Sequence, residues 1–139
     1  EQSALEQQWE QLKAAEKQRD SVLDGIPPGL PALALADKFL SKARRAGRPL
    51  GDATAEQWAA DLMSLVGTSE SSDNIDDQRV VEARLGRGFI GVVAAARQLG
   101  IDPESALRAA LGEATRSFRA SEGEGETGGG KWFTDWVGG

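Results

Sequence analysis

The stretch that decides the fold is DDQRVVEARLGRGFIGVVAAARQL, residues 76–99. Its apolar residues recur every three or four positions, which is the period of one face of an α-helix. We therefore predict a long helix here, ended by Gly100. Gly86, Gly88 and Gly91 would each weaken an isolated helix, so their clustering indicates that another helix approaches closely.

Four further segments carry helical patterns. We expect the first of these helices in residues 1–20, continuing to Asp24, and the second in residues 30–47, between Pro31 and Gly47. We expect the third in residues 55–66, with Thr54 as its N-cap, and the fourth from Pro103 onward, with Asp102 as its N-cap. No segment shows the period of a β-strand. The sequence therefore predicts an all-α fold, a bundle of about five helices that bury their apolar faces against one another.

The end of the chain differs from the rest in composition. SEGEGETGGG (121–130) is rich in glycine and glutamate, and KWFTDWVGG (131–139) contains two tryptophans and one phenylalanine. We expect one helical domain over residues 1–120, followed over 121–139 by a flexible linker and a short aromatic tail. The tail is expected to cover an apolar surface in this chain or in a partner.

Composition excludes several chemistries. The 139 residues include no Cys and no His, so the chain has no thiolate nucleophile, no catalytic triad with histidine and no imidazole or thiolate metal site. A bound metal would have oxygen ligands, which favours magnesium, manganese or calcium. No apolar run has the roughly 20 residues of a membrane span, so we expect a cytoplasmic protein without membrane contact. The net charge of -6 argues against a nucleic-acid partner.

One positive surface is concentrated on the second predicted helix. Lys38, Lys42 and Arg45 recur at spacings of four and three residues and therefore share a helix face. Such a face has two interpretations: a solvated surface, or a binding site for phosphate groups.

Three blocks of the sequence resemble a known family. WEQLKAAEK (9–17), SVLDGIPPGLPALALADKFLSKARRAG (21–47) and VVAAARQLGIDPESALRAA (92–110) resemble, in order and spacing, the C-terminal domain of the MazG family of nucleoside triphosphate pyrophosphohydrolases. The resemblance implies an all-α dimer that converts a nucleoside triphosphate to the monophosphate and pyrophosphate. It also implies a magnesium site with four carboxylates, two from an EExxE motif on one helix and two from an ExxD motif on the next.

The family's metal motifs are altered in this chain. EExxE falls on residues 60–64 (ADLMS), where Asp61 alone is acidic and would be a vestigial ligand. ExxD falls on residues 84–87 (RLGR), so Arg84 and Arg87 stand where carboxylates are expected. A guanidinium stays protonated and repels a dication by about 8 kcal/mol at about 4 Å and an effective dielectric of about 20. We expect no magnesium at this site, no catalytic residue in this chain, and an ion pair between Asp61 and one arginine.

Three functions remain open from the sequence. The favoured one is a degenerate MazG domain that supports dimerisation or regulation, with a homodimer as its assembly and another MazG domain upstream in a longer polypeptide. A second is a working pyrophosphohydrolase. The third is a module that binds a nucleoside triphosphate or phosphate without hydrolysis, through Lys38, Lys42, Arg45, Arg84 and Arg87.

Overall fold

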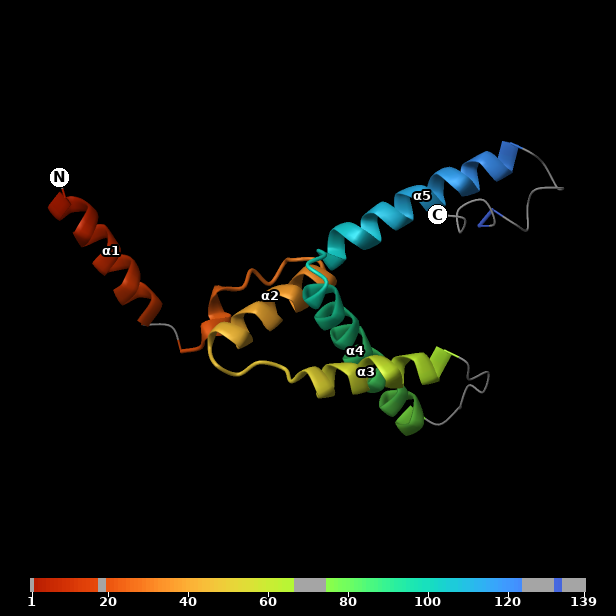
Figure 1. The fold of residues 1–139 in the computed structure, drawn as a ribbon, viewed down its shortest axis with the longest axis horizontal. Coiled ribbons are helices and arrows are strands. Elements are labelled where there is room, and N and C mark those ends of the chain that lie inside the picture. The colour runs from red at the N-terminus through yellow and green to blue at the C-terminus, as the bar shows by residue number, and fades with distance from the viewer. Residues whose placement is uncertain (1, 18–19, 67–74, 124–131, 134–139) are drawn as a thin grey trace. The chain divides into compact units, whose positions relative to one another are not determined.

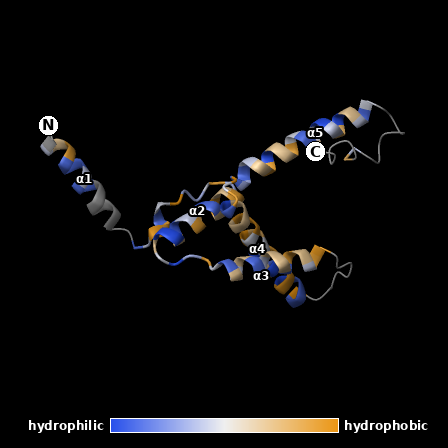
Figure 2. Cartoon of the chain, in the orientation of Figure 1, coloured by the Kyte–Doolittle hydropathy of each residue, from blue (hydrophilic) through white to orange (hydrophobic). Residues whose placement is uncertain are grey.

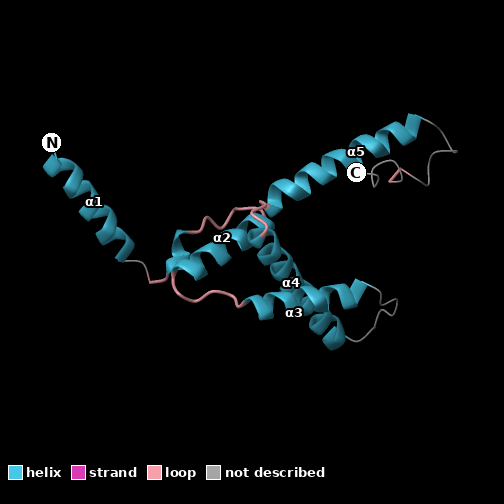
Figure 3. Cartoon of the chain, viewed as in Figure 1, coloured by secondary structure: helices cyan, strands magenta, loops and turns pink. Residues whose placement is uncertain are grey.

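The computed structural model describes residues 2–17, 20–66, 75–123 and 132–133. Within these ranges every regular element is helical, which confirms the all-α prediction (Figure 3). The elements are α1 (Gln2–Lys17), the 3₁₀ turn η1 (Val22–Gly25), α2 (Ala32–Arg45), α3 (Asp52–Val66), α4 (Ile75–Gln98) and α5 (Pro103–Gly123) (Figure 1). The chain divides into two compact units, Glu1–Ala95 and Ala96–Gly139.

Two glycines end helices as the sequence predicts. Gly47 follows α2 with φ of +76°, and Gly100 follows α4 with φ of +71°. After each, the chain turns back on the helix: the amide of Arg48 donates to the carbonyl of Ala43 at 2.9 Å, and that of Ile101 donates to Ala96 at 2.9 Å. These bonds satisfy carbonyls at the helix end, and the left-handed conformation they require favours glycine.

The start of α3 differs from the sequence prediction, whereas the start of α5 agrees with it. α3 begins at Asp52, and the carbonyl of Gly51 accepts the first helical bond from the amide of Ala55 at 3.0 Å. Thr54 therefore lies in the first turn, and its assignment as N-cap is wrong. Asp102 does occupy the cap of α5, because its carbonyl accepts from the amide of Ala106 at 3.0 Å.

The first helical pattern is interrupted. α1 ends at Lys17, and Ser21 begins the separate turn η1 instead of continuing the helix to Asp24. The Ser21 hydroxyl accepts from the amide of Leu23, and the Asp24 carboxylate accepts from the amide of Ser21, each at 3.1 Å. This reciprocal cap is encoded in the sequence as Ser-x-x-Asp. The turn contacts α2, so the connector with Pro27 and Pro28 follows an anchored element.

α3 and α4 touch through two glycines of α4. A Cβ atom built on Gly88 would lie 2.4 Å from the Cβ of Leu62, and one built on Gly91 would lie 2.6 Å from the carbonyl oxygen of Ala55. Both distances are far below van der Waals contact, so only glycine allows this approach. The predicted close helix contact is therefore present, with α3 as the partner (Figure 1). Gly86, by contrast, has open space around its Cβ position.

The buried core is small for the amount of apolar surface. Among the described residues, the buried hydrophobic side chains are Leu40, Ala55 and Val93. Four apolar side chains of α4 stay between 40% and 50% exposed: Val81, Leu85, Phe89 and Val92. Hydrophobic residues are interspersed with hydrophilic ones along the helices, as expected for amphipathic helices (Figure 2). One chain leaves much of its apolar surface in contact with water.

The glycine contact predicts a sharp difference between neighbouring substitutions. Gly88→Ala and Gly91→Ala should each lower the free energy of unfolding by about 1–3 kcal/mol, because the added methyl forces α3 and α4 apart. Gly86→Ala should raise it by up to about 1 kcal/mol through helix propensity. Urea unfolding followed by circular dichroism measures all three. Equal effects at the three positions would contradict the contact.

Candidate functional site

The basic residues of α2 lie where the sequence places them. Lys38 and Arg45 are exposed and Lys42 is half-buried, and the three lie on one face of the helix. Lys42 and Arg45 also belong to the last turn of α2, where cations interact favourably with the negative end of the helix dipole. Within the described part of the chain, none of the three forms an ion pair.

Asp61 lies on α3 beside the glycine contact. It is half-buried, and its Oδ1 accepts a hydrogen bond from Nε2 of Gln57, one turn earlier, at 3.0 Å. Its carbonyl accepts from the Ser64 hydroxyl at 2.7 Å. Both contacts are local to α3, and the one made by the carboxylate is the bond from Gln57.

Arg84 and Arg87 lie on α4 within about one turn of Gly88, which touches Leu62 next to Asp61. Both arginines are exposed. No salt bridge among the described residues joins Asp61 to either of them, so the expected ion pair is wrong. The physical reason is solvation: an exposed guanidinium gains little from a surface pair, and the carboxylate already has the Gln57 amide as donor.

The donor set at this position does not fit a magnesium ion. The arrangement that the family resemblance implies needs carboxylates from two helices, whereas here Asp61 accepts a hydrogen bond from an amide and α4 carries the exposed Arg84 and Arg87. Elsewhere in the described ranges no cluster of three or more acidic residues has the geometry to hold a cation. Because the arginines are exposed, water and salt weaken their repulsion of a dication, and the missing ligands are the larger loss.

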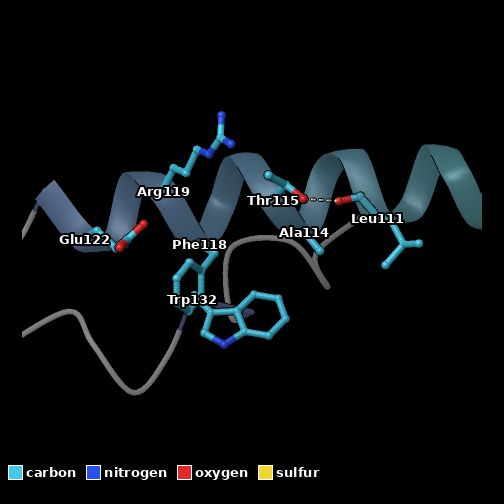
Figure 4. Close-up of a pocket in the computed structure, with 7 residues that line it drawn as sticks. All are labelled: Leu111, Ala114, Thr115, Phe118, Arg119, Glu122 and Trp132. Atoms are coloured by element: carbon cyan, nitrogen blue, oxygen red, sulfur yellow. Dashed lines mark hydrogen bonds between the residues drawn. The ribbon is translucent and has the colours of Figure 1, made fainter.

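A pocket on α5 was not predicted from the sequence. It has a volume of about 410 Å³ and is open to solvent. Its walls are Leu111, Ala114, Thr115, Phe118, Arg119 and Glu122 of α5, with Trp132 from the tail (Figure 4). The indole of Trp132 meets the ring of Phe118 edge to face, with centroids 6.1 Å apart. The sequence signals were the apolar spacing on α5 and the aromatic tail, but nothing in the sequence says that they meet.

Comparison with known proteins identifies the relatives of this all-α chain. It is 37% identical to an uncharacterised 26.1 kDa protein of Streptomyces cacaoi, over 86% of this chain and 39% of that protein. It is 55% identical to a nucleoside triphosphate pyrophosphohydrolase of Mycobacterium tuberculosis, over 30% of this chain and 13% of that protein. It is 31% identical to the nucleoside triphosphate pyrophosphohydrolase/pyrophosphatase MazG of Thermotoga maritima, over 83% of this chain and 44% of that protein.

The chain is MazG-like. The resemblance found in the three sequence blocks is thereby confirmed at the level of the family. No protein-family model matches the chain. The MazG-like chain spans less than half the length of each of these three relatives, so their names describe longer proteins. No helix in the described ranges is long and apolar enough to cross a membrane.

The local bonding of Asp61 predicts a small effect of its removal. Asp61→Ala should change the free energy of unfolding by less than about 1 kcal/mol, because a half-exposed bond within one helix turn is lost and the new residue favours helix. Urea unfolding of this variant at low and at high salt measures the effect. A loss of about 3 kcal/mol or more would show that Asp61 pairs with a buried charge after all.

Proposed function

We propose that this MazG-like chain is a catalytically degenerate domain that supports dimerisation or regulation and does not itself hydrolyse nucleoside triphosphates. The observation that carries the proposal is the chemistry at the α3–α4 contact: Asp61 is bonded within its own helix, and Arg84 and Arg87 replace the family's carboxylates. A pyrophosphohydrolase site of the family type needs cations that neutralise phosphate charge and activate water. This chain offers no ligand set for them at that position.

Dimerisation is supported by the apolar surface of α4. Val81, Leu85, Phe89 and Val92 recur at spacings of four, four and three residues and therefore form one stripe, the α4 stripe. A stripe of four half-exposed large side chains is costly in water and matches what a helix of a second copy would bury. A two-fold pair would place the same stripe of each copy against the other.

The proposed regulatory role requires a second MazG domain that is catalytically active. A degenerate domain contributes to turnover if it holds or orients a domain that keeps all four carboxylates, and we propose such a MazG domain in the same polypeptide as the partner. Its support is the likeness to longer proteins named nucleoside triphosphate pyrophosphohydrolase. Such a partner would supply the magnesium chemistry, and this chain would supply apolar surface and fold.

The alternative function is binding of a nucleoside triphosphate or phosphate without hydrolysis. It is favoured by the exposure of Lys38, Arg45, Arg84 and Arg87, which form no ion pair within the described residues. Guanidinium groups three positions apart on a helix can contact two oxygens of one phosphate. The pocket on α5 is lined by neither set of cations.

The proposal predicts that the purified chain releases no pyrophosphate above background from nucleoside triphosphates in the presence of magnesium. It also predicts no binding of manganese, the paramagnetic substitute for magnesium, at the α3–α4 contact. Restoring acidic residues at the altered motif positions, as Ala60→Glu, Ser64→Glu, Arg84→Glu and Arg87→Asp in one variant, should create manganese binding together with Asp61. Electron paramagnetic resonance measures it, with the same variant lacking Asp61 as control.

Two outcomes of that experiment would redirect the proposal. Turnover by the unaltered chain that is lost in Asp61→Ala would establish it as an enzyme. Triphosphate binding in the presence of EDTA that is lost when Lys38, Lys42 and Arg45 are all replaced by alanine would favour the alternative function.

The α4 stripe predicts a specific break in self-association. Leu85→Glu should lower the association constant at least about tenfold, because it places a charge in a surface that a second copy would bury. Ala83→Glu adds the same charge to an exposed position on the opposite side of α4 and should have little effect. Sedimentation equilibrium measures both variants. A chain that remains monomeric at high micromolar concentration would contradict this part of the proposal.

A further inference from the structure

α5 carries a second apolar surface, separate from the α4 stripe. Leu107, Leu111, Ala114 and Phe118 recur at spacings of four, three and four residues and form a narrow line along the helix, the α5 seam. Its three large side chains are between 47% and 56% exposed. This spacing is that of a coiled-coil seam, which packs best against another helix with the same spacing.

The tail of the chain reaches one end of this seam. The ring of Trp132 lies against Phe118, and the Ser117 hydroxyl donates a hydrogen bond to the backbone carbonyl of Trp132. Phe133 adds a second edge-to-face contact to the indole, with centroids 5.7 Å apart. Figure 4 shows the indole beside Phe118, while Leu111 lies further along the helix. The tail thus covers the Phe118 end and leaves the Leu107 and Leu111 end to solvent.

The covalent connection favours a contact within one chain. Ser117 and Gly123, the last residue of α5, are about 9 Å apart along the helix axis. The nine residue steps from Gly123 to Trp132 can extend to about 30 Å, so the connection reaches the seam without strain. A short tether gives an effective concentration in the millimolar range, which exceeds the concentration of other copies in dilute solution.

We propose that Trp132 is an intramolecular cover for the α5 seam and that it lowers self-association of the chain through this seam. The occupant that it excludes is the α5 seam of a second copy. The seam is self-complementary in spacing and continuous with the surface that the tail already occupies. Because Trp132 lies at the Phe118 end of the α5 seam, it reduces the association without abolishing it.

The test compares the association constants of the full 139-residue chain and three variants by sedimentation equilibrium. Trp132→Ala should raise the constant about tenfold, because it removes the ring that competes for Phe118. Trp132→Phe keeps an aromatic edge and should raise it less. Trp9→Ala, which removes an exposed tryptophan from α1, is the matched control and should not raise it.

A second substitution tests whether the higher association constant of Trp132→Ala arises from contacts of the α5 seam. Leu111→Glu added to Trp132→Ala should return the constant to that of the unaltered chain, because it places a charge in the seam. The increase in the association constant caused by Trp132→Ala should persist in chains that also carry Leu85→Glu. The experiment therefore tests this proposal independently of the proposed dimer through the α4 stripe.

Two results would overturn the proposal. An unchanged constant in Trp132→Ala would show that the tail does not compete for the seam. A lowered constant would show that the tail itself joins two copies. Circular dichroism spectra matching those of the unaltered chain exclude unfolding as the cause of either result.

Discussion

The close approach of α3 and α4 is the constraint on which the rest of the first unit depends. At Gly88 and Gly91 the two helices come so near that a single methyl group would overlap Leu62 or the α3 backbone. The contact replaces side-chain interdigitation by direct backbone contact, which gains dispersion energy over many atoms. It also sets the rotation of α4, and with it the residues that face α3 and those that face solvent.

This rotation explains the character of the candidate site. Asp61 adjoins Leu62 at the contact, and Arg84 and Arg87 lie within about one turn of Gly88, so the contact brings together the segments that would hold metal in the family. The arginines extend into water instead of bridging to Asp61, because a guanidinium at the surface keeps its hydration at little cost. Among the described residues, no ion pair of Asp61 with Arg84 or Arg87 links the two helices.

The same rotation leaves the α4 stripe on the outside. Among the described residues few hydrophobic side chains are buried, and two apolar lines, the α4 stripe and the α5 seam, are about half-exposed. The two lines differ in what lies against them. The tail reaches the α5 seam through Trp132, whereas nothing on α4 plays that part in the described residues.

The sequence by itself determined the all-α class and the family, and several of the helix ends. Periodicity, the glycines after α2 and α4 and the cap at Asp102 act within a few residues, and local rules suffice for them. The clustering of Gly86, Gly88 and Gly91 predicted a close contact, but only the tertiary structure separated the two that make it from Gly86, which does not. The choice between Asp61 bonding to Gln57 and Asp61 pairing with arginine, and the meeting of Trp132 with Phe118, also depended on it. These outcomes depend on how segments far apart in sequence are placed and on which polar groups remain hydrated. The local spacing of residues predicts neither.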